Sequence, residues 1–173
     1  MIKINSLNKI NSKFLTLLFK KKNLGCYLLI TFIFFLDRVF KIKIVSQTNN
    51  NTIYINDFIN LELIWNTGIG FGLLSSNTNL FYNLITTIIG MVIIFLIFLL
   101  IKSNLVDKIL FSLVIGGALG NFYDRLLYFA VPDFIDIHYG SFHWFTFNIA
   151  DIFISLGIII LIIKDLFLKN EKN

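Results

Sequence analysis

Four long apolar runs divide this 173-residue chain. The run 80–101 carries no charged residue, and the run 24–40 is interrupted only by Asp37 and Arg38. An α-helix rises 1.5 Å per residue, so about 20 residues cross a hydrocarbon core about 30 Å thick. The pattern therefore predicts four membrane-spanning helices, at about 24–42, 80–101, 106–128 and 149–168.

The longest stretch between two runs, 43–79, has a different pattern. Its segments 53–55 and 58–65 are rich in β-branched and aromatic residues, with Asn56-Asp57 between them as a turn signal. We expect a few short strands on the membrane surface, which hold the glycine-rich segment 66–72. The second polar stretch, 129–148, is interpreted as a loop that joins the last two helices.

The positions of the lysines predict how the four helices are oriented across the membrane. The lysines gather in the first 22 residues, in the 102–108 connection and beyond the fourth run, and four crossings put all three regions on one side. Because positive charge favours the cytoplasmic side, both termini are expected there and 43–79 outside. The predicted fold is a membrane protein with an all-α transmembrane bundle of four helices and a small extracytoplasmic β-rich subdomain.

We expect one domain, 24–168, between a basic cytoplasmic tail, 1–23, and a short cytoplasmic tail, 169–173. The lysines of the first tail could anchor it to anionic lipid. A solvated, disordered tail would have the same composition, and the sequence leaves the two alternatives open.

Composition narrows the class of protein. Hydrophobic residues make up 57% of the chain and charged residues 14%, which is too apolar for an ordinary soluble domain. The single cysteine, Cys26, excludes an internal disulfide and is interpreted as a buried helix residue. The net charge of +5 does not indicate nucleic-acid binding, because the lysines flank apolar segments.

Polar side chains recur on the last two predicted helices. Gly117, Asn121, Asp124 and Arg125 follow helical spacing along one stripe, and Asn148, Asp151 and Ser155 do so on the fourth helix. Asp133 lies in the connection between the two helices, so it can approach Asp151 at the outer mouth of the bundle. Asp124 and Arg125 could form a supporting ion pair, or Arg125 could contact a ligand carbonyl. Gly116 and Gly120 predict close helix packing.

Asp37 and Lys41 are four residues apart and share a helix face. They could be an interfacial pair that extends to the headgroups, or a pair that supports the polar site. We prefer the second interpretation, because other polar groups arrive at the same face of the membrane.

Two carboxylates in one dry site cannot both ionise cheaply, so one acid and one base can coexist near neutral pH. Such a pair could activate water, as in aspartic proteases, or relay protons in a small transporter. Other chemistry is disfavoured: Cys26 lies near the opposite face, and Ser141 and Ser155 lack a positioned histidine base. The two histidines, His138 and His143, are too few for a histidine-rich metal site and are expected at the surface or interface.

In these residues the chain resembles bacterial lipoprotein signal peptidase (signal peptidase II), a family of four-span intramembrane aspartyl proteases. The resemblance covers roughly 27–164 and consists of separate blocks in the family's order. These blocks are Asp37 with Lys41, Asn66-Thr67-Gly68 with Phe71-Gly72, Gly116-Gly117-Ala118-Leu119-Gly120-Asn121 with Asp124-Arg125, Val131-Pro132-Asp133-Phe134, and Phe147-Asn148-Ile149-Ala150-Asp151.

The resemblance implies that Asp133 and Asp151 form the catalytic dyad. It implies a supporting or substrate-binding role for nine further residues: Asp37, Lys41, Asn66, Gly68, Asn121, Asp124, Arg125, Asn148 and Ala150. The implied substrate is a prolipoprotein whose cysteine carries a diacylglyceryl group, cut just before that cysteine. No metal or organic cofactor and no nucleic acid is implied, and we expect a monomer in the bacterial inner membrane with its site at the outer face.

The chain departs from the family pattern at a few positions. Ile69 and Gly70 stand where the family usually has alanines, and Pro132 replaces a valine. A glycine common upstream of that position is replaced around Phe129-Ala130. These departures concern substrate preference, because they leave all the candidate reactive groups in place.

A transporter would place its acids near the midplane, often with internal repeats, and neither feature is visible. A purely structural subunit would not explain the polar residues of two facing helices. The peptidase is therefore the favoured hypothesis.

Overall fold

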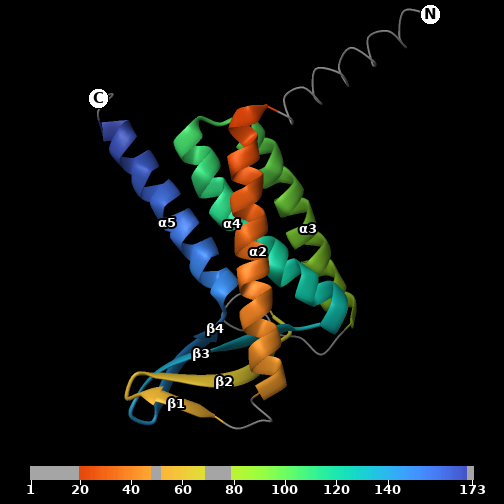
Figure 1. Cartoon of the computed structure of the whole chain (residues 1–173), viewed down its shortest axis with the longest axis vertical. Helices are drawn as coiled ribbons and strands as arrows, with labels where there is room; N and C mark the ends of the chain where they lie inside the picture. The colour runs from red at the N-terminus through yellow and green to blue at the C-terminus, as the bar shows by residue number, and fades with distance from the viewer. Residues whose placement is uncertain (1–19, 48–51, 69–78, 171–173) are drawn as a thin grey trace, which may run out of the picture.

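The computed structural model describes residues 20–47, 52–68 and 79–170. Its helices form a bundle above one end of a small sheet (Figure 1). They are α2 (Lys21–Gln47), α3 (Asn79–Lys102), α4 (Leu105–Tyr128) and α5 (Ile149–Asn170). All four apolar runs are therefore helical. The first helix continues five residues beyond the span expected at 24–42, so the segment 43–47 is helix and not part of the outer loop.

Helix α4 is the centre of the bundle, because it packs against α2, α3 and α5. Glycines allow the closest approaches. A Cβ atom on Gly116 would lie 2.8 Å from Cβ of Ile33 in α2, and one on Gly117 would collide with the carbonyl oxygen of Ala150 in α5. A Cβ on Gly120 would lie 2.6 Å from Oδ2 of Asp37. The predicted close packing at Gly116 and Gly120 is thus confirmed, and it brings α2 and α5 onto two faces of α4.

The polar stretches together form one antiparallel sheet in the order β1-β2-β3-β4. The strands are β1 (Ile53–Asn56), β2 (Ile59–Asn66), β3 (Val131–Tyr139) and β4 (Phe142–Phe147). The first two agree with the strands expected in 43–79. Interpreting 129–148 as a loop was wrong, since most of it forms β3 and β4.

Strand β3 could not be predicted from the sequence pattern, for a physical reason. Residues 131–134 are all buried, so both faces of the strand are covered there and no simple alternation of polar and apolar residues marks it. Pro132 also argues against a central strand, because it cannot donate a ladder hydrogen bond. The hairpin turns at Gly140, whose φ of 58° is readily adopted only by glycine.

Helix α4 ends at Phe129, which has a left-handed backbone with φ of 56°. Glycine is the usual residue at this position of a helix end. The departure noted around Phe129-Ala130 therefore falls on the one described non-glycine residue with positive φ.

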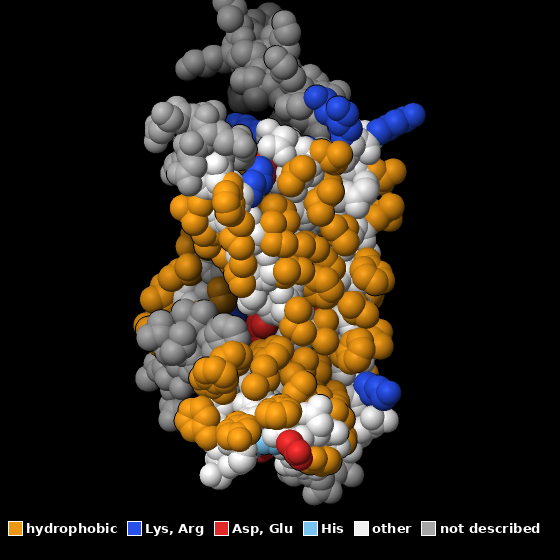
Figure 2. Space-filling view, turned by 90° about the vertical axis from the view of Figure 1, so that its left-hand side faces the viewer, with side chains coloured by type: hydrophobic (Ala, Val, Ile, Leu, Met, Phe, Trp, Pro, Cys, Tyr) orange, Lys and Arg blue, Asp and Glu red, His pale blue; other side chains and the backbone are white. Residues whose placement is uncertain are grey.

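The helices α3 and α4 are long and apolar enough to cross a membrane, over Leu80–Lys102 and Leu105–Tyr128. They are the two such helices among the described residues. Apolar side chains also cover much of the outer surface of the helical body (Figure 2). Inside it, Cys26, Leu100 and Ile115 form a buried cluster, which confirms the buried position expected for Cys26.

Candidate active site

Asp133 is near the start of β3 and is 2% exposed. Pairing of β3 with β2 brings the end of β2 alongside it. There, Nδ2 of Asn66 donates to Oδ2 of Asp133 at 2.8 Å. Nδ2 of Asn148, just before α5, donates to the other carboxyl oxygen at 2.6 Å. Two side-chain amides thus fix both oxygens of this carboxyl group.

Asp151 is fixed by the first turn of α5. The side chain of Asn148 accepts from the backbone N–H of Asp151 at 3.1 Å, and the Asp151 carboxylate accepts from the backbone N–H of Asn148 at 3.2 Å. This reciprocal pair is a capping box, which satisfies two N–H groups at the start of a helix. Nδ2 of Asn121, from α4, donates to Oδ1 of Asp151 at 2.8 Å.

Asn148 therefore joins the two acids. Its amide nitrogen donates to Asp133, while its amide oxygen caps the turn that carries Asp151. The convergence expected from the sequence is present, although it is made by a strand and a helix end and not by a loop.

Burial raises the pKa of Asp133 to about 6, from an ordinary value of 3.8. The nearby negative charge of Asp151 adds to this increase, and the donors Asn66 and Asn148 oppose it. Desolvation and a like charge both favour the protonated form of a carboxyl group. Asp133 can consequently exchange a proton near neutral pH.

A buried ion cluster lies between α2 and α4. Nζ of Lys41 is 2.9 Å from Oδ2 of Asp37 and 2.7 Å from Oδ2 of Asp124. It also donates to Oδ1 of Asn121 at 2.7 Å. Asn121 in turn donates to Asp151, and Asn148 links Asp151 to Asp133. Hydrogen bonds therefore connect this cluster to both acids.

The backbone of α5 is tied to the same cluster, since the N–H of Ala150 donates to Oδ1 of Asp37 at 3.1 Å. The Asp37–Lys41 pair is buried, with 0% and 1% exposure, so it is not an interfacial pair. Its position agrees with the preferred interpretation of a pair that supports the polar site.

The sequence analysis did not select Arg38, which belongs to the same cluster. Its Nη1 lies 2.5 Å from Oδ1 of Asp124, and its guanidinium carbon lies 5.1 Å from the ring centre of Tyr123. The available signal was a second charge inside an apolar run, next to Asp37.

Arg125 does not pair with Asp124, which corrects one of the two expectations for these neighbours. Asp124 faces α2, whereas Nη2 of Arg125 donates to the carbonyl oxygen of Gly68 after β2. Arg125 also lies 5.6 Å from the ring centre of Tyr82 in α3. Its Nε and Nη1 are buried and have no hydrogen-bond partner among the described residues. This arginine retains donors that could bind a carbonyl group.

Gly68 is also held from β2, because its N–H donates to Oδ1 of Asn66 at 2.8 Å. One asparagine thus positions the backbone next to Arg125 and the carboxyl group of Asp133. The positions Ile69 to Gly72 of the same sequence block lie outside the described residues.

His138 is not a surface residue, contrary to expectation: it is 9% exposed, and its Nδ1 lies 3.6 Å from Oδ2 of Asp136. Nδ1 of His143 lies 2.8 Å from the same oxygen, and its side chain is about half exposed, as expected. Residue 138 pairs with residue 143 across the hairpin that the sequence analysis missed. Within the described ranges there is no group of three acidic, histidine or cysteine side chains placed to hold a metal ion.

Comparison with known proteins gives a consistent result. Residues 29–167 match the family model described as signal peptidase (SPase) II. The lipoprotein signal peptidase of Pelagibacter ubique is 50% identical over 148 residues, which cover 84% of this chain and 88% of that protein. The lipoprotein signal peptidase of Aquifex aeolicus is 38% identical, covering 87% of this chain and 92% of the relative.

A solved structure of a bacterial membrane enzyme superposes with a TM-score of 0.71 at 34% identity. The superposition covers 86% of this chain and 92% of the other. The fold is thus that of a membrane enzyme.

Proposed function

The chain belongs to the signal peptidase II family, and from this membership we propose that it hydrolyses diacylglyceryl-modified prolipoproteins just before the lipidated cysteine, with Asp133 and Asp151 as the catalytic dyad. The observation that carries the proposal is the position of Asn148, which donates to Asp133 and forms a capping box with Asp151. One residue thereby fixes the relative placement of both acids.

In the proposed reaction the two carboxyl groups share one proton. The ionised group removes a proton from water as the water oxygen attacks the scissile carbonyl carbon, and the protonated group donates to the carbonyl oxygen. When the tetrahedral intermediate collapses, the first group passes its proton to the leaving amine, and the second group takes its proton back from a hydroxyl of the intermediate, which becomes the product carboxyl group. The pKa of Asp133, raised by burial to about 6, supports a shared proton near neutral pH.

The surrounding residues have positioning or binding roles in this proposal. Asn121 orients Asp151, and Lys41 holds Asn121 while it neutralises Asp37 and Asp124. Asn66 and Asn148 orient Asp133. The free donors of Arg125, next to the carbonyl of Gly68, are available to the substrate backbone. No step in this scheme needs a metal or an organic cofactor.

We propose that all four helices of the single domain 24–168 cross the bacterial inner membrane, with the sheet and dyad at the outer face. The lysines near the opposite ends of the helices support this orientation, because positive charge favours the cytoplasmic side. A monomer without nucleic-acid partners is sufficient, since all the proposed site residues come from one chain. A lipid-modified substrate would then approach the dyad laterally from the bilayer.

Cleavage by the purified protein tests this function. A diacylglyceryl-modified prolipoprotein and the same protein without the lipid are incubated with the full chain and followed by gel shift. We expect cleavage of the modified substrate only, and none by the Asp133→Asn/Asp151→Asn double variant. If the folded wild-type protein cleaved neither substrate, the peptidase assignment would be wrong. The transporter alternative finds no support in the family match.

A further inference from the structure

A polar cavity lies at the end of the helices opposite the sheet. It measures about 530 Å³ and lies between the start of α2 and the α3–α4 connection. Several Lys and Arg side chains gather at this end of the molecule (Figure 2). We call it the lysine cavity, and the polar side chains that line it are Lys20, Lys22, Asn23, Lys102, Ser103 and Lys108.

Lys108 is the buried member of this set, with 7% exposure. Its Nζ donates to Oδ1 of Asn23 at 2.6 Å and to the carbonyl oxygen of Ile101 at 3.0 Å. Both acceptors are neutral, and an ammonium group has three N–H donors. A buried charge is costly unless an opposite charge accompanies it. Among the described residues, no carboxylate lines the lysine cavity.

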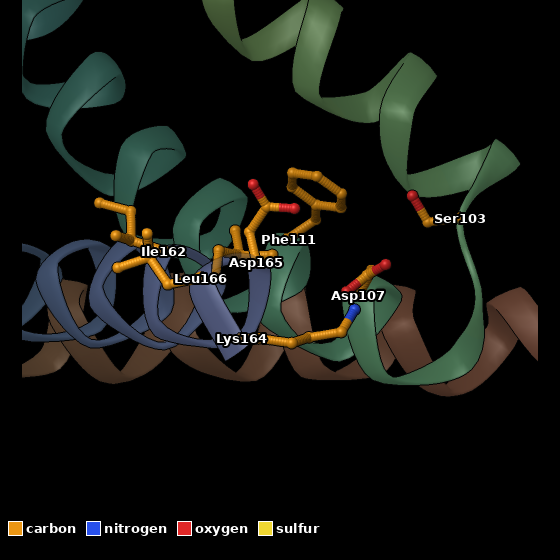
Figure 3. Close-up of a pocket in the computed structure, with 8 residues that line it drawn as sticks. Ser103, Asp107, Phe111, Ile162, Lys164, Asp165 and Leu166 are labelled. Atoms are coloured by element: carbon orange, nitrogen blue, oxygen red, sulfur yellow. Dashed lines mark hydrogen bonds and ion pairs between the residues drawn. The ribbon is translucent and has the colours of Figure 1, made fainter. Parts of the chain in front are cut away.

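The neighbouring acid, Asp107, is already engaged. One of its carboxyl oxygens pairs with Lys164 of α5, and the other accepts from Nδ2 of Asn104 at 2.6 Å. Figure 3 shows Lys164 extending toward Asp107 in an adjacent cavity of about 500 Å³, which Asp165 also lines. That cavity contains both signs of charge, whereas the charged lining of the lysine cavity is entirely positive.

The backbone adds to the positive potential. Helix α2 begins at Lys21 and has no acidic residue in its first turn, so its N-terminal end favours an anion. Lys102 is held over the ring of Phe98, with Nζ 4.0 Å from the ring centre. The buried ammonium, the exposed lysines and the helix end therefore all contribute positive potential to this cavity.

We propose that the lysine cavity binds a phosphate-bearing anion, supplied by the headgroup of an anionic phospholipid or by free phosphate. Lysines bind phosphate as point charges that donate hydrogen bonds, and the cavity is large enough to admit a headgroup. The cavity lies at an end of an apolar bundle, where a phospholipid headgroup is available to it. This site is separate from the proposed dyad, so anion binding can be tested independently of the proposed cleavage reaction.

Native mass spectrometry of the full chain in neutral detergent tests the proposal. Phosphatidylglycerol, phosphatidylcholine and inorganic phosphate are the probes. We expect phosphatidylglycerol to be retained in preference to phosphatidylcholine, whose choline compensates the phosphate charge. A lysine close to a lipid surface contributes a factor of about five in affinity. The Lys20→Gln/Lys22→Gln/Lys102→Gln variant should therefore bind phosphatidylglycerol on the order of 100-fold more weakly.

A control is Lys43→Gln, which removes an exposed lysine outside the cavity and should bind as the wild type does. Displacement of the lipid by millimolar phosphate would identify free phosphate as the source of the anion. Lipid that resists this competition would identify the headgroup. Equal retention of both lipids with no binding of phosphate, or wild-type affinity in the triple variant, would overturn the proposal.

Lys108→Gln needs a second measurement, because the variant could be less stable for structural reasons alone. The thermal unfolding midpoint is measured with and without phosphatidylglycerol. We expect the lipid to raise the midpoint of the wild type and not that of the folded variant. An equal increase in both proteins would contradict the role of Lys108 in binding the anion.

Discussion

Two buried lysines of the described helices, Lys41 and Lys108, lie toward opposite ends of the bundle and differ in the partners that surround them. Lys41 is 2.9 Å from Asp37 and 2.7 Å from Asp124, and it holds Asn121. Lys108 has only neutral acceptors within the described chain. The cluster at Lys41 therefore carries its own counter-ions, and it can hold the site in place without a ligand. The cavity at Lys108 lacks a counter-ion, which a ligand can provide.

The largest effect is expected from breaking the self-neutralised cluster. Lys41→Met leaves Asp37 and Asp124 buried near one another with Arg38 as the remaining cation. Removal of one partner of a buried ion pair typically costs about 3–5 kcal/mol, so we expect a loss of this size in the free energy of unfolding.

Thermal unfolding in detergent measures this loss. The control is Lys43→Met, an exposed lysine on the same helix, which should change the free energy of unfolding by less than about 0.5 kcal/mol. Similar midpoints for Lys41→Met and Lys43→Met would show that the cluster does not stabilise the bundle.

The next effect concerns pH and Asp133. Because its pKa is about 6 when folded and 3.8 ordinarily, the native state retains a proton between these values that the unfolded chain has lost. This group therefore makes the free energy of unfolding fall as pH rises through that window, by about 3 kcal/mol in all. Its contribution levels off above pH 6.

Asp133→Asn should remove this part of the pH dependence, and Asp57→Asn, in the exposed β1–β2 turn, should leave it intact. Unfolding followed between pH 4 and pH 7 measures both. An unchanged slope in Asp133→Asn would mean that another group is responsible.

A smaller effect tests how closely α2 packs against α4 next to the ion cluster. A Cβ added by Gly120→Ala would lie 2.6 Å from Oδ2 of Asp37, so either this carboxylate, which Lys41 holds, or helix α2 itself must shift. Overpacking of this kind costs about 1–3 kcal/mol. The matched control is Gly25→Ala, where an added Cβ meets no atom within 4 Å. That change should stabilise the helix by up to about 1 kcal/mol, and a loss equal to that of Gly120→Ala would contradict the packing argument.

The smallest effect lies at the end of α4. Phe129 has a φ of 56°, so Phe129→Gly relieves backbone strain and should stabilise the protein by at most about 1 kcal/mol. Tyr128→Gly, one residue earlier and still helical, should instead destabilise it by about 1 kcal/mol. If Phe129→Gly and Tyr128→Gly lowered the thermal midpoint equally, the backbone of Phe129 would not be strained.

The sequence could predict those features of the fold that depend on local patterns. The four helices follow from apolar runs, and the Asp37–Lys41 pair follows from helical spacing. Strands β3 and β4 could not be predicted in this way, because Pro132 and the burial of both faces hide the pattern of β3. Arg38 and His138 were missed as parts of clusters, because their partners come from a different helix or from the missed hairpin. The separation of Arg125 from Asp124 depends on α4 packing against several helices at once.

The site residues were selected by resemblance to a family, and their geometry depends on contacts that spacing alone does not specify. Asn148 could be placed at the start of a helix from the sequence. Its simultaneous contacts with Asp133 and Asp151 require the pairing of β3 with β2 and the packing of α5 on α4. Those are long-range contacts, which no local pattern encodes.

Cleavage of the diacylglyceryl-modified prolipoprotein by three single variants tests the central claim most directly. The variants Asp133→Asn, Asp151→Asn and Asp124→Asn are compared with the wild type, after each is shown to be folded by its thermal unfolding. We predict that the first two lower the cleavage rate by at least about 100-fold, and that Asp124→Asn retains measurable activity. Normal cleavage by Asp133→Asn, together with an inactive but folded Asp124→Asn, would contradict the account and place Asp124 in the dyad.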